Sequence, residues 1–241
     1  MSKQRVLLAI FAHTDDETVV SPVLARYARE GVRVHLVYAT DGRHGVRGHF
    51  GNVSGKELAD LRREEGENVA RELGLAEPIF LGLEDSSLGQ FTNPTGHALR
   101  DLSGKLHEAI EDKKPDAIVT WGADGGYFHP DHCLVHTVVT QVVQASERQI
   151  RLFYFGIAHE RLQNAKGPFS GFVGTDARYL TVRVPFSDAD LAAARRSFAC
   201  HQSQFTPETV KHLDRFLTQA WSGEVTFRPW FGEHESDTLF S

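Results

Sequence analysis

Two short clusters of imidazoles and carboxylates are the residues of this sequence best suited to chemistry. The first is the run His13-Thr14-Asp15-Asp16-Glu17, and the second is the run His129-Pro130-Asp131-His132. Adjacent carboxylates repel one another unless a positive charge lies nearby. A helix N-terminus relieves part of that repulsion, so an acidic helix cap would account for the first cluster. A bound cation explains its density better.

The second cluster has more than one explanation. A turn around Pro130 with Asp131 as the helix cap would account for it. An Asp between two His residues is also typical of metal sites, because the carboxylate orients a ligating imidazole through its second ring nitrogen. His136 follows His132 by four residues on the same helical face, so these two form an alternative ligand pair.

One imidazole from each cluster together with one Asp would give three protein ligands. Imidazole and carboxylate ligands with a fourth position left open are typical of a catalytic zinc site. Asp15 would remain beside the metal, free to act as a base. The sequence contains no G-x-G-x-x-G, no G-x-S-x-G and no H-E-x-x-H motif, which argues against dinucleotide binding and against the hydrolases that these motifs mark.

Both clusters must be positioned by the elements around them. Residues 6–11 and 32–39 are apolar runs typical of buried strands, and residues 19–29 between them have helical spacing that ends at Gly31. A strand, a helix and a strand in this order form a βαβ unit and predict a parallel sheet. Further along we expect strands at 77–81, 117–121, 151–157, 179–184 and 225–231, and helices at 56–73, 97–112, 132–145, 187–204 and 207–220.

The alternation predicts an α/β fold, with a Rossmann-like, mostly parallel sheet flanked by helices. We expect a single domain over residues 1–241 with a less regular C-terminal third, since no repeat and no Pro- or Ser-rich linker divides the chain. Ligands of such folds bind beyond the carboxyl ends of the strands. The two clusters follow the predicted strands 6–11 and 117–121, so both are expected at that edge.

Composition excludes several classes of protein. Hydrophobic residues make up 41% and charged residues 24% of the sequence, which favours a globular protein with a sizeable core over a disordered one. The net charge of −6 provides no general attraction to nucleic acid or anionic lipid. The sequence has no apolar run of membrane-spanning length and no secretory signal, so we expect a cytoplasmic protein. Two cysteines are too few for a disulfide framework.

The clusters resemble the signatures of a known family. With Ala12 before it, the first cluster resembles the A-H-P-D-D-E motif of the PIG-L/LmbE-like zinc-dependent N-acetylglucosaminyl deacetylases, with Thr14 in place of Pro. The second cluster resembles the second motif of that family. Weaker similarities follow in the family's order: residues 62–65 resemble its R-x-x-E helix, residues 83–88 a segment with a sugar-contacting Asp, and residues 201–204 a late H-x-S-Q motif.

The resemblance implies a zinc-dependent amidohydrolase that removes the N-acetyl group from an N-acetylglucosamine-containing conjugate. Its partner would be this small molecule, with neither nucleic acid nor membrane involved. By the family pattern His13, Asp16 and His132 would bind one Zn²⁺ per chain, or another divalent transition metal. Asp15 would act as the general base on a metal-activated water.

The same pattern assigns roles to residues around the metal. His129 would stabilise the oxyanion or act as an acid, with Tyr127 nearby and Asp131 as a further catalytic residue. The residues expected to bind substrate are Arg62, Asp85 and Arg43. Arg43 stands where many family members carry an acidic residue.

Two alternative functions stay open. A metal-dependent esterase or phosphohydrolase would use the same site, although a two-metal phosphatase needs further bridging carboxylates that these clusters barely provide. A non-catalytic protein of the same fold would bind sugar or metal without turnover. The sequence also leaves open the native metal, the group attached to the sugar, the role of His201, and whether the chain forms a homo-oligomer.

Overall fold

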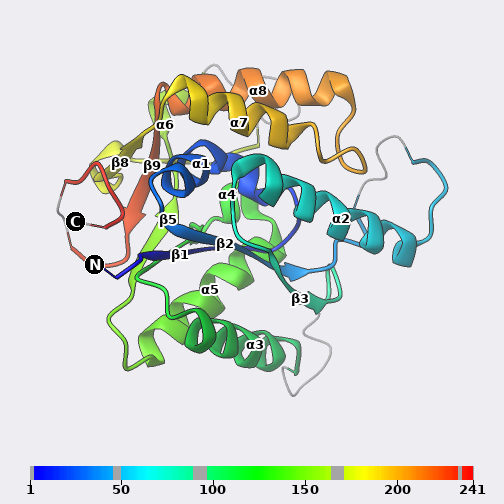
Figure 1. The fold of residues 1–241 in the computed structure, drawn as a ribbon, viewed down its shortest axis with the longest axis horizontal. Helices are drawn as coiled ribbons and strands as arrows, with labels where there is room; N and C mark the ends of the chain where they lie inside the picture. Colours follow the sequence, from blue (N-terminus) through cyan, green and yellow to red (C-terminus); the bar gives the residue numbers. More distant parts are fainter. Residues whose placement is uncertain (1–2, 46–49, 89–96, 164–170, 233–234, 241) are drawn as a thin grey trace.

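A computed structural model describes residues 3–45, 50–88, 97–163, 171–232 and 235–240 of the chain. Its centre is a seven-stranded sheet in the order β3-β2-β1-β4-β5-β9-β8 (Figure 1). The strands are β1 Val6–Phe11, β2 Arg33–Thr40, β3 Ile79–Leu83, β4 Ala117–Trp121, β5 Arg151–Phe155, β8 Val182–Pro185 and β9 Glu224–Pro229.

Five of these strands run in one direction. β1 pairs in parallel with β2 on one side and β4 on the other, and β3 and β5 extend the parallel part. β9 pairs antiparallel with both β5 and β8, so strands from the C-terminal third complete the same sheet. The predicted α/β fold with a mostly parallel sheet flanked by helices is confirmed.

Helices cover both faces of the sheet (Figure 1). Successive strand residues point to opposite faces, so Leu8 and Ile10 of β1 contribute to one core while Leu7 and Phe11 contribute to the other. The first core is closed by α3 His97–Lys113 and α5 Pro130–Ala145. The second is closed by α1 Ser21–Arg29, α2 Gly55–Leu73, α7 Asp188–Phe198 and α8 Pro207–Trp221.

Smaller elements fill the connections. They are α4 Gly125–Phe128, α6 His159–Leu162 and the short strands β6 Ile157–Ala158 and β7 Gly174–Thr175. Residues 46–49, between β2 and α2, and residues 89–96, between β3 and α3, lie outside the described residues. No helix in the described part of the chain is long and apolar enough to cross a membrane.

Two helices are shorter than predicted because the residues next to them form polar contacts instead of helical turns. The helix predicted at 19–29 begins at Ser21, because a 3-10 turn over Asp16–Val19 precedes it. The helix predicted at 187–204 ends at Phe198. After it, His201 contacts the carboxylate of Glu17 and Ser203 that of Glu65. The strand predicted at 179–184 is found at Val182–Pro185. Local periodicity reports burial but carries no information about such long-range partners.

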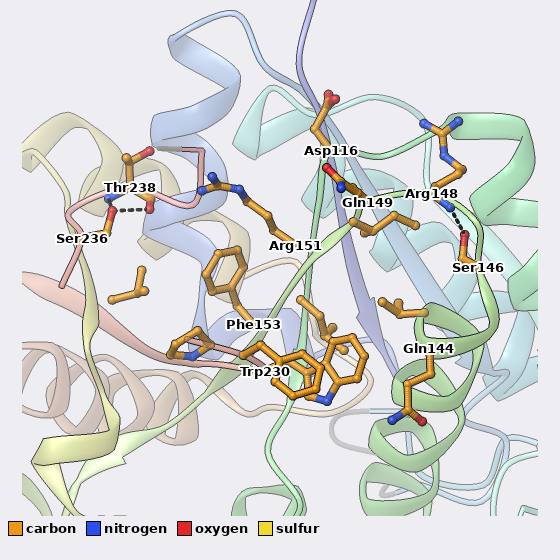
Figure 2. Close-up of a pocket in the computed structure, with 16 residues that line it drawn as sticks. Asp116, Gln144, Ser146, Arg148, Gln149, Arg151, Phe153, Trp230, Ser236 and Thr238 are labelled. Atoms are coloured by element: carbon orange, nitrogen blue, oxygen red, sulfur yellow. Dashed lines mark hydrogen bonds between the residues drawn. The ribbon is translucent and has the colours of Figure 1, made fainter. Parts of the chain in front are cut away.

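A cavity of about 940 Å³ lies at the amino ends of β4 and β5 (Figure 2). The two polar clusters lie beyond the carboxyl ends of β1 and β4, at the opposite ends of the strands. Asp116 before β4, Arg151 at the start of β5 and Trp230 after β9 line it. Its position excludes it from the site that the clusters form.

Asp190 joins α7 to α1. Its carboxylate accepts hydrogen bonds from Nε and Nη2 of Arg29 at 2.9 Å each, and from the N–H and Oγ of Ser187 at 2.9 and 2.7 Å. Burial would raise the pKa of Asp190, but the hydrogen bonds from Arg29 and Ser187 outweigh it and hold the pKa below its ordinary value. The ionised form therefore stabilises the fold.

We expect Asp190→Asn to lower the free energy of unfolding by about 1–2 kcal/mol at pH 7, since it weakens a helix cap and removes a charge-assisted pair. A folded pKa below the unfolded one gives stability that is present above about pH 4 and is lost as the pH falls further. Urea unfolding at pH 7 and pH 3 measures this. A difference between the two proteins that does not shrink at pH 3 would contradict the assignment.

Candidate active site

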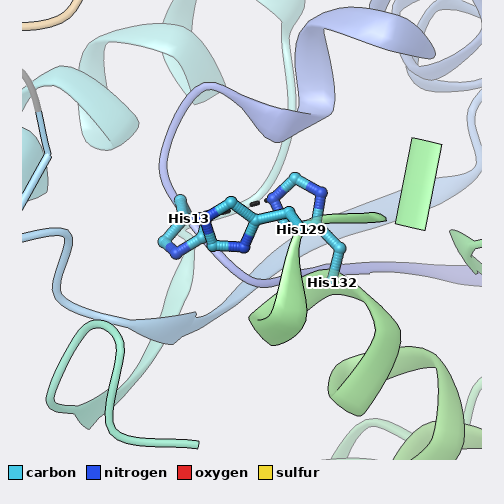
Figure 3. A group of neighbouring side chains, drawn as sticks. All are labelled: His13, His129 and His132. Carbon is cyan, nitrogen blue, oxygen red and sulfur yellow. Dashed lines mark hydrogen bonds between the residues drawn. The ribbon is translucent and has the colours of Figure 1, made fainter. Parts of the chain in front are cut away.

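The pairing of β1 with β4 brings the two polar clusters together. Both strands end at the same edge of the sheet. The first cluster follows β1 directly, and the second lies at the start of α5, which follows β4 after the short helix α4. His13 Nδ1 lies 3.1 Å from Nε2 of His132, which is 119 residues away in the chain. Figure 3 shows the rings of His13, His129 and His132 gathered beside the start of α5. The predicted meeting of the two clusters is confirmed.

Asp16 joins the two imidazoles. Its Oδ1 lies 3.1 Å from His132 Nε2, and its Oδ2 lies 3.7 Å from His13 Nδ1. Oδ2 also accepts three N–H groups, those of Ala12 at 3.0 Å, His13 at 2.9 Å and the Trp121 indole at 3.1 Å. This leaves Oδ1 facing Nε2 of His132.

Each imidazole is oriented by a contact to the ring nitrogen that points away from the other imidazole. His132 Nδ1 donates to the carbonyl of Gly125 at 2.9 Å, which directs the Nε2 lone pair at the cluster. His13 Nε2 lies 3.1 Å from Oδ1 of Asp85 and 3.3 Å from Oδ2 of Asp131, so its Nδ1 is the nitrogen that faces His132. Partners of this kind orient the metal-binding imidazoles of known metal sites.

Charge also favours a cation here. Burial would raise the pKa of Asp16, but His132 and His13 beside it keep the pKa well below its ordinary value, so the carboxylate is ionised. Burial would lower the pKa of His13, but the carboxylates of Asp131, Asp16 and Asp85 raise it well above the ordinary value. Three carboxylates around one buried imidazole attract positive charge. The donor set fits a divalent metal ion held by His13, Asp16 and His132.

Other side chains lie close enough to be ligands as well. The ligand atoms of His13, His129 and His132 are all within 4.8 Å of one another, and so are those of His13, Asp85 and Asp131. His136 does not join them: its Nδ1 lies 3.0 Å from the Trp121 carbonyl, and its ring packs on Tyr154. The alternative pair of His132 with His136 is therefore not assembled.

Asp15 adopts a backbone conformation that is uncommon for a side-chain-bearing residue. Its φ is 114°, and its N–H donates to Oε2 of Glu17 at 3.0 Å. The Asp15 carboxylate has no hydrogen bond to any residue that the structure describes. Burial raises the pKa of Asp15 to about 6, against the opposing charge of Arg62. A carboxylate with a pKa near neutrality is suited to accept and release a proton.

His129 and Tyr127 form one wall of the site. Burial and the neighbouring His132 and His13 lower the pKa of His129, which favours the neutral ring. Its Nδ1 accepts the Asp131 N–H at 3.2 Å, so the ring proton is on Nε2. Neutral His129 can thus donate a hydrogen bond. Burial and the charge of Asp16 raise the pKa of Tyr127, which keeps its hydroxyl a donor.

The expected substrate-binding residues differ in their surroundings. Arg62 is 2% exposed, and its Nε and Nη2 have no hydrogen-bond partner among the described residues. Arg43 pairs with Asp41 at 2.6 Å and with Glu84 at 3.7 Å. Asp85, besides contacting His13, accepts the His44 N–H at 3.0 Å. Substrate binding by these three residues stays a prediction. Of the three, Arg62 has guanidinium donors that lack a partner in the described structure and could bind a substrate.

Two residues of the site were not predicted from the sequence. Trp121 was predicted only as the last residue of the strand 117–121. Its ring stacks on that of His132, with 4.6 Å between the ring centroids and 6° between the ring planes, and its indole N–H donates to Asp16. Gly125, whose carbonyl orients His132, has φ of 57° and lies so close to His132 that a Cβ would come within 2.7 Å of that side chain's Cβ. The place of Trp121, at the end of the strand before the second cluster, was an available signal.

Comparison with known proteins fits this geometry. The model of the PIG-L family, described as GlcNAc-PI de-N-acetylase, matches residues 8–143, more than half of the chain. The chain belongs to the PIG-L family. It is 31% identical over 207 residues to a 1D-myo-inositol 2-acetamido-2-deoxy-alpha-D-glucopyranoside deacetylase of Mycobacteroides abscessus, a match that covers 79% of this chain and 74% of that protein. Matches to other relatives of that name cover about half to three fifths of their length.

Solved structures share the fold of this PIG-L member. N,N'-diacetylchitobiose deacetylase from Pyrococcus horikoshii has a TM-score of 0.66 at 22% identity, over 93% of this chain and 83% of that one. GalB, a 4-carboxy-2-hydroxymuconate hydratase from Pseudomonas putida, has a TM-score of 0.67 at 14% identity, over 95% and 97% of the two chains. One fold thus carries different reactions, and the reaction must be argued from the site.

We expect Gly125→Ala to weaken divalent-metal binding about 10- to 100-fold, because it disturbs the carbonyl that orients His132. It should also destabilise the fold by more than the about 1–2 kcal/mol that a Cβ costs at positive φ, since the new Cβ overlaps the His132 side chain. Calorimetric metal titration and urea unfolding measure the two effects.

Gly31→Ala is the matched control, because Gly31 also has positive φ, 82°, but a Cβ there would meet open space in the described structure. This variant should lose stability through backbone strain alone and keep its metal affinity. Equal metal affinities in the two variants would disprove the role of Gly125.

Proposed function

We propose that this protein is a zinc-dependent amidohydrolase that removes the N-acetyl group from an N-acetylglucosamine-containing conjugate. The observation that carries the proposal is that His13 Nδ1 and Asp16 Oδ1 both lie 3.1 Å from His132 Nε2. The neighbouring Asp15 carboxylate has no hydrogen-bond partner in the described structure. Membership of the PIG-L family supports the same chemistry.

His13, Asp16 and His132 would hold one Zn²⁺ per chain. Zinc, when bound, acts as a Lewis acid toward the amide carbonyl and lowers the pKa of an attacking water. Asp85 and Asp131, hydrogen-bonded to the rear nitrogen of His13, would make that imidazole a stronger ligand.

Asp15 would move the proton. Its pKa of about 6 leaves it ionised at neutral pH, and therefore able to take a proton from the attacking water. The protonated carboxyl would then pass the proton to the leaving amine, which must be protonated because an amide anion is a poor leaving group.

Tyr127 and His129 would bind the oxyanion that develops on the carbonyl. The Tyr127 ring lies 6.0 Å from that of His129 and 5.2 Å from that of His132, so both donors border the metal site. Preorganised donors directed at a developing charge are among the largest contributions to catalysis. Because burial and the other imidazoles lower the pKa of His129, we assign it as a neutral Nε2–H donor.

Arg62 would bind the sugar. Its buried guanidinium is confined by Gly42 and Gly45, where any Cβ would overlap it, and its Nε and Nη2 are unpartnered in the described structure. Donors buried without partners are costly unless a ligand pairs with them. Because the named relatives act on an acetamido sugar linked to inositol and on diacetylchitobiose, we expect a conjugate in which N-acetylglucosamine carries a second ring.

The test is release of free primary amine by zinc-loaded protein from N-acetylglucosaminyl-inositol and from diacetylchitobiose. We expect Asp15→Asn to keep the metal but to lower kcat by about 10² or more, as loss of a general base does. Asp190→Asn makes the same change far from the site and should keep normal turnover.

Three other results would each overturn the proposal. Turnover of a phosphate monoester without amine release would favour a phosphohydrolase. Saturable binding of the sugars without hydrolysis would favour a binding protein. Near-normal amine release by Asp15→Asn would remove the base from the mechanism.

A further inference from the structure

The late His201-Gln202-Ser203-Gln204 segment has no place in the mechanism above, yet two of its side chains are completely buried. His201 is 1% exposed and Ser203 is 0% exposed. The segment follows α7, where the helix stops at Phe198, and it turns back toward β1 and α2. Burial of polar side chains is costly without partners, so their partners indicate what the segment does.

His201 reaches the catalytic turn through Glu17. Its Nε2 lies 2.7 Å from Oε1 of Glu17, and both side chains are inaccessible to solvent. The two residues are 184 positions apart, and no other described group contacts that carboxylate oxygen by a hydrogen bond. Glu17 belongs to the first polar cluster but does not face the metal ligands.

The second oxygen of Glu17 holds the backbone of Asp15. Oε2 accepts the Asp15 N–H at 3.0 Å and the Tyr38 hydroxyl at 2.9 Å. On the other side of the residue, the Asp15 carbonyl accepts the N–H and the Oγ1 of Thr18 at 3.1 and 2.7 Å. Asp15 is thus fixed by hydrogen bonds at both of its peptide groups.

Such fixing is needed because the Asp15 backbone is strained. A φ of 114° is unfavourable for a residue with a Cβ and persists only where the surroundings impose it. A relaxed backbone at this position would turn the carboxylate in another direction. The hydrogen bonds that Glu17 and Thr18 make with the peptide groups of Asp15 oppose this relaxation.

Ser203 anchors the same segment to α2. Its N–H and Oγ both bind the buried carboxylate of Glu65, at 2.6 Å each. Arg62 lies one helical turn before Glu65, and its charge acts on Asp15. The position of His201 is therefore fixed by the helix that carries the proposed sugar-binding arginine.

Stability alone explains this arrangement poorly. A buried ion pair seldom stabilises a fold more than apolar side chains of similar size would. Here the buried polar side chains meet at the strained residue that the proposed mechanism uses as its base. Orientation of that base accounts for both observations.

We propose that Glu17, held in place by His201 and Tyr38, is a positioning residue that keeps the Asp15 carboxylate directed at the reacting groups. This rests on the proposed function, in which Asp15 is the base. In the described structure the Glu17 carboxylate has hydrogen bonds to Asp15, Tyr38 and His201 and none to a proposed metal ligand. Removing it should therefore lower kcat and leave KM and metal content nearly unchanged.

A double-mutant cycle tests the proposal. We expect Glu17→Ala to lower kcat about 10- to 100-fold and Glu17→Gln, whose amide oxygen still accepts the Asp15 N–H, to recover most of the loss. In an Asp15→Asn background Glu17→Ala should change the residual rate by less than about twofold, because residues that act as one unit are strongly non-additive. An equal loss in both backgrounds, or a parallel loss of metal, would overturn the proposal.

A milder variant covers the case in which Glu17→Ala does not fold. Tyr38→Phe removes one hydrogen bond to Glu17, and we expect a kcat loss of about 3- to 10-fold that is again absent with Asp15→Asn. Tyr27→Phe is the matched control, since the buried Tyr27 hydroxyl accepts the Leu239 N–H at 2.8 Å far from the site. Equal kcat values for the two Phe variants would contradict the proposal.

A crystal structure of Glu17→Ala, or of Tyr38→Phe if the former does not fold, gives a readout that is independent of activity. We expect the Asp15 backbone or carboxylate to leave its present orientation; an unchanged Asp15 would refute the positioning role. If Asp15→Asn proves fully active, the assignment of Asp15 as the base fails, while this structure still shows whether Glu17 holds the Asp15 backbone.

Discussion

The parallel pairing of β1 with β4 is the constraint on which the rest of the site depends. It places the two polar clusters, which are far apart in the chain, at one edge of the sheet, with His13 Nδ1 3.1 Å from His132 Nε2. Two imidazole nitrogens and the Asp16 carboxylate then share one small space. A divalent cation reconciles this crowding, because it lets all three lone pairs point inward.

The surrounding residues mainly orient the side chains that would bind the metal. The Gly125 carbonyl, the Trp121 ring and the Asp85 and Asp131 carboxylates each contact a metal-ligand candidate from behind. The pair of Glu17 and His201 does the same for the backbone of Asp15. The fold is shared with proteins of other activity, so these contacts, rather than the sheet, are where the chemistry of this family member is determined.

The sequence predicts the framework well and the contacts poorly. The strand at 117–121 was predicted to the residue, and the carboxyl-edge rule correctly brought the two clusters together, because burial and strand direction leave a local pattern. Asp131 was expected to orient a ligating imidazole, and its carboxylate does contact one, but that imidazole is His13 of the other cluster. Neither that contact nor the one between Glu17 and His201 leaves a periodic signal, since both depend on side-chain directions across the sheet edge.

The most direct test of the account is a crystal structure of the protein with zinc added, using anomalous scattering at the zinc edge. We expect one anomalous peak per chain, about 2.0–2.2 Å from His13 Nδ1, Asp16 Oδ1 and His132 Nε2. A zinc-loaded crystal with no peak between these atoms, or with the ion bound by other residues, would contradict the central claim.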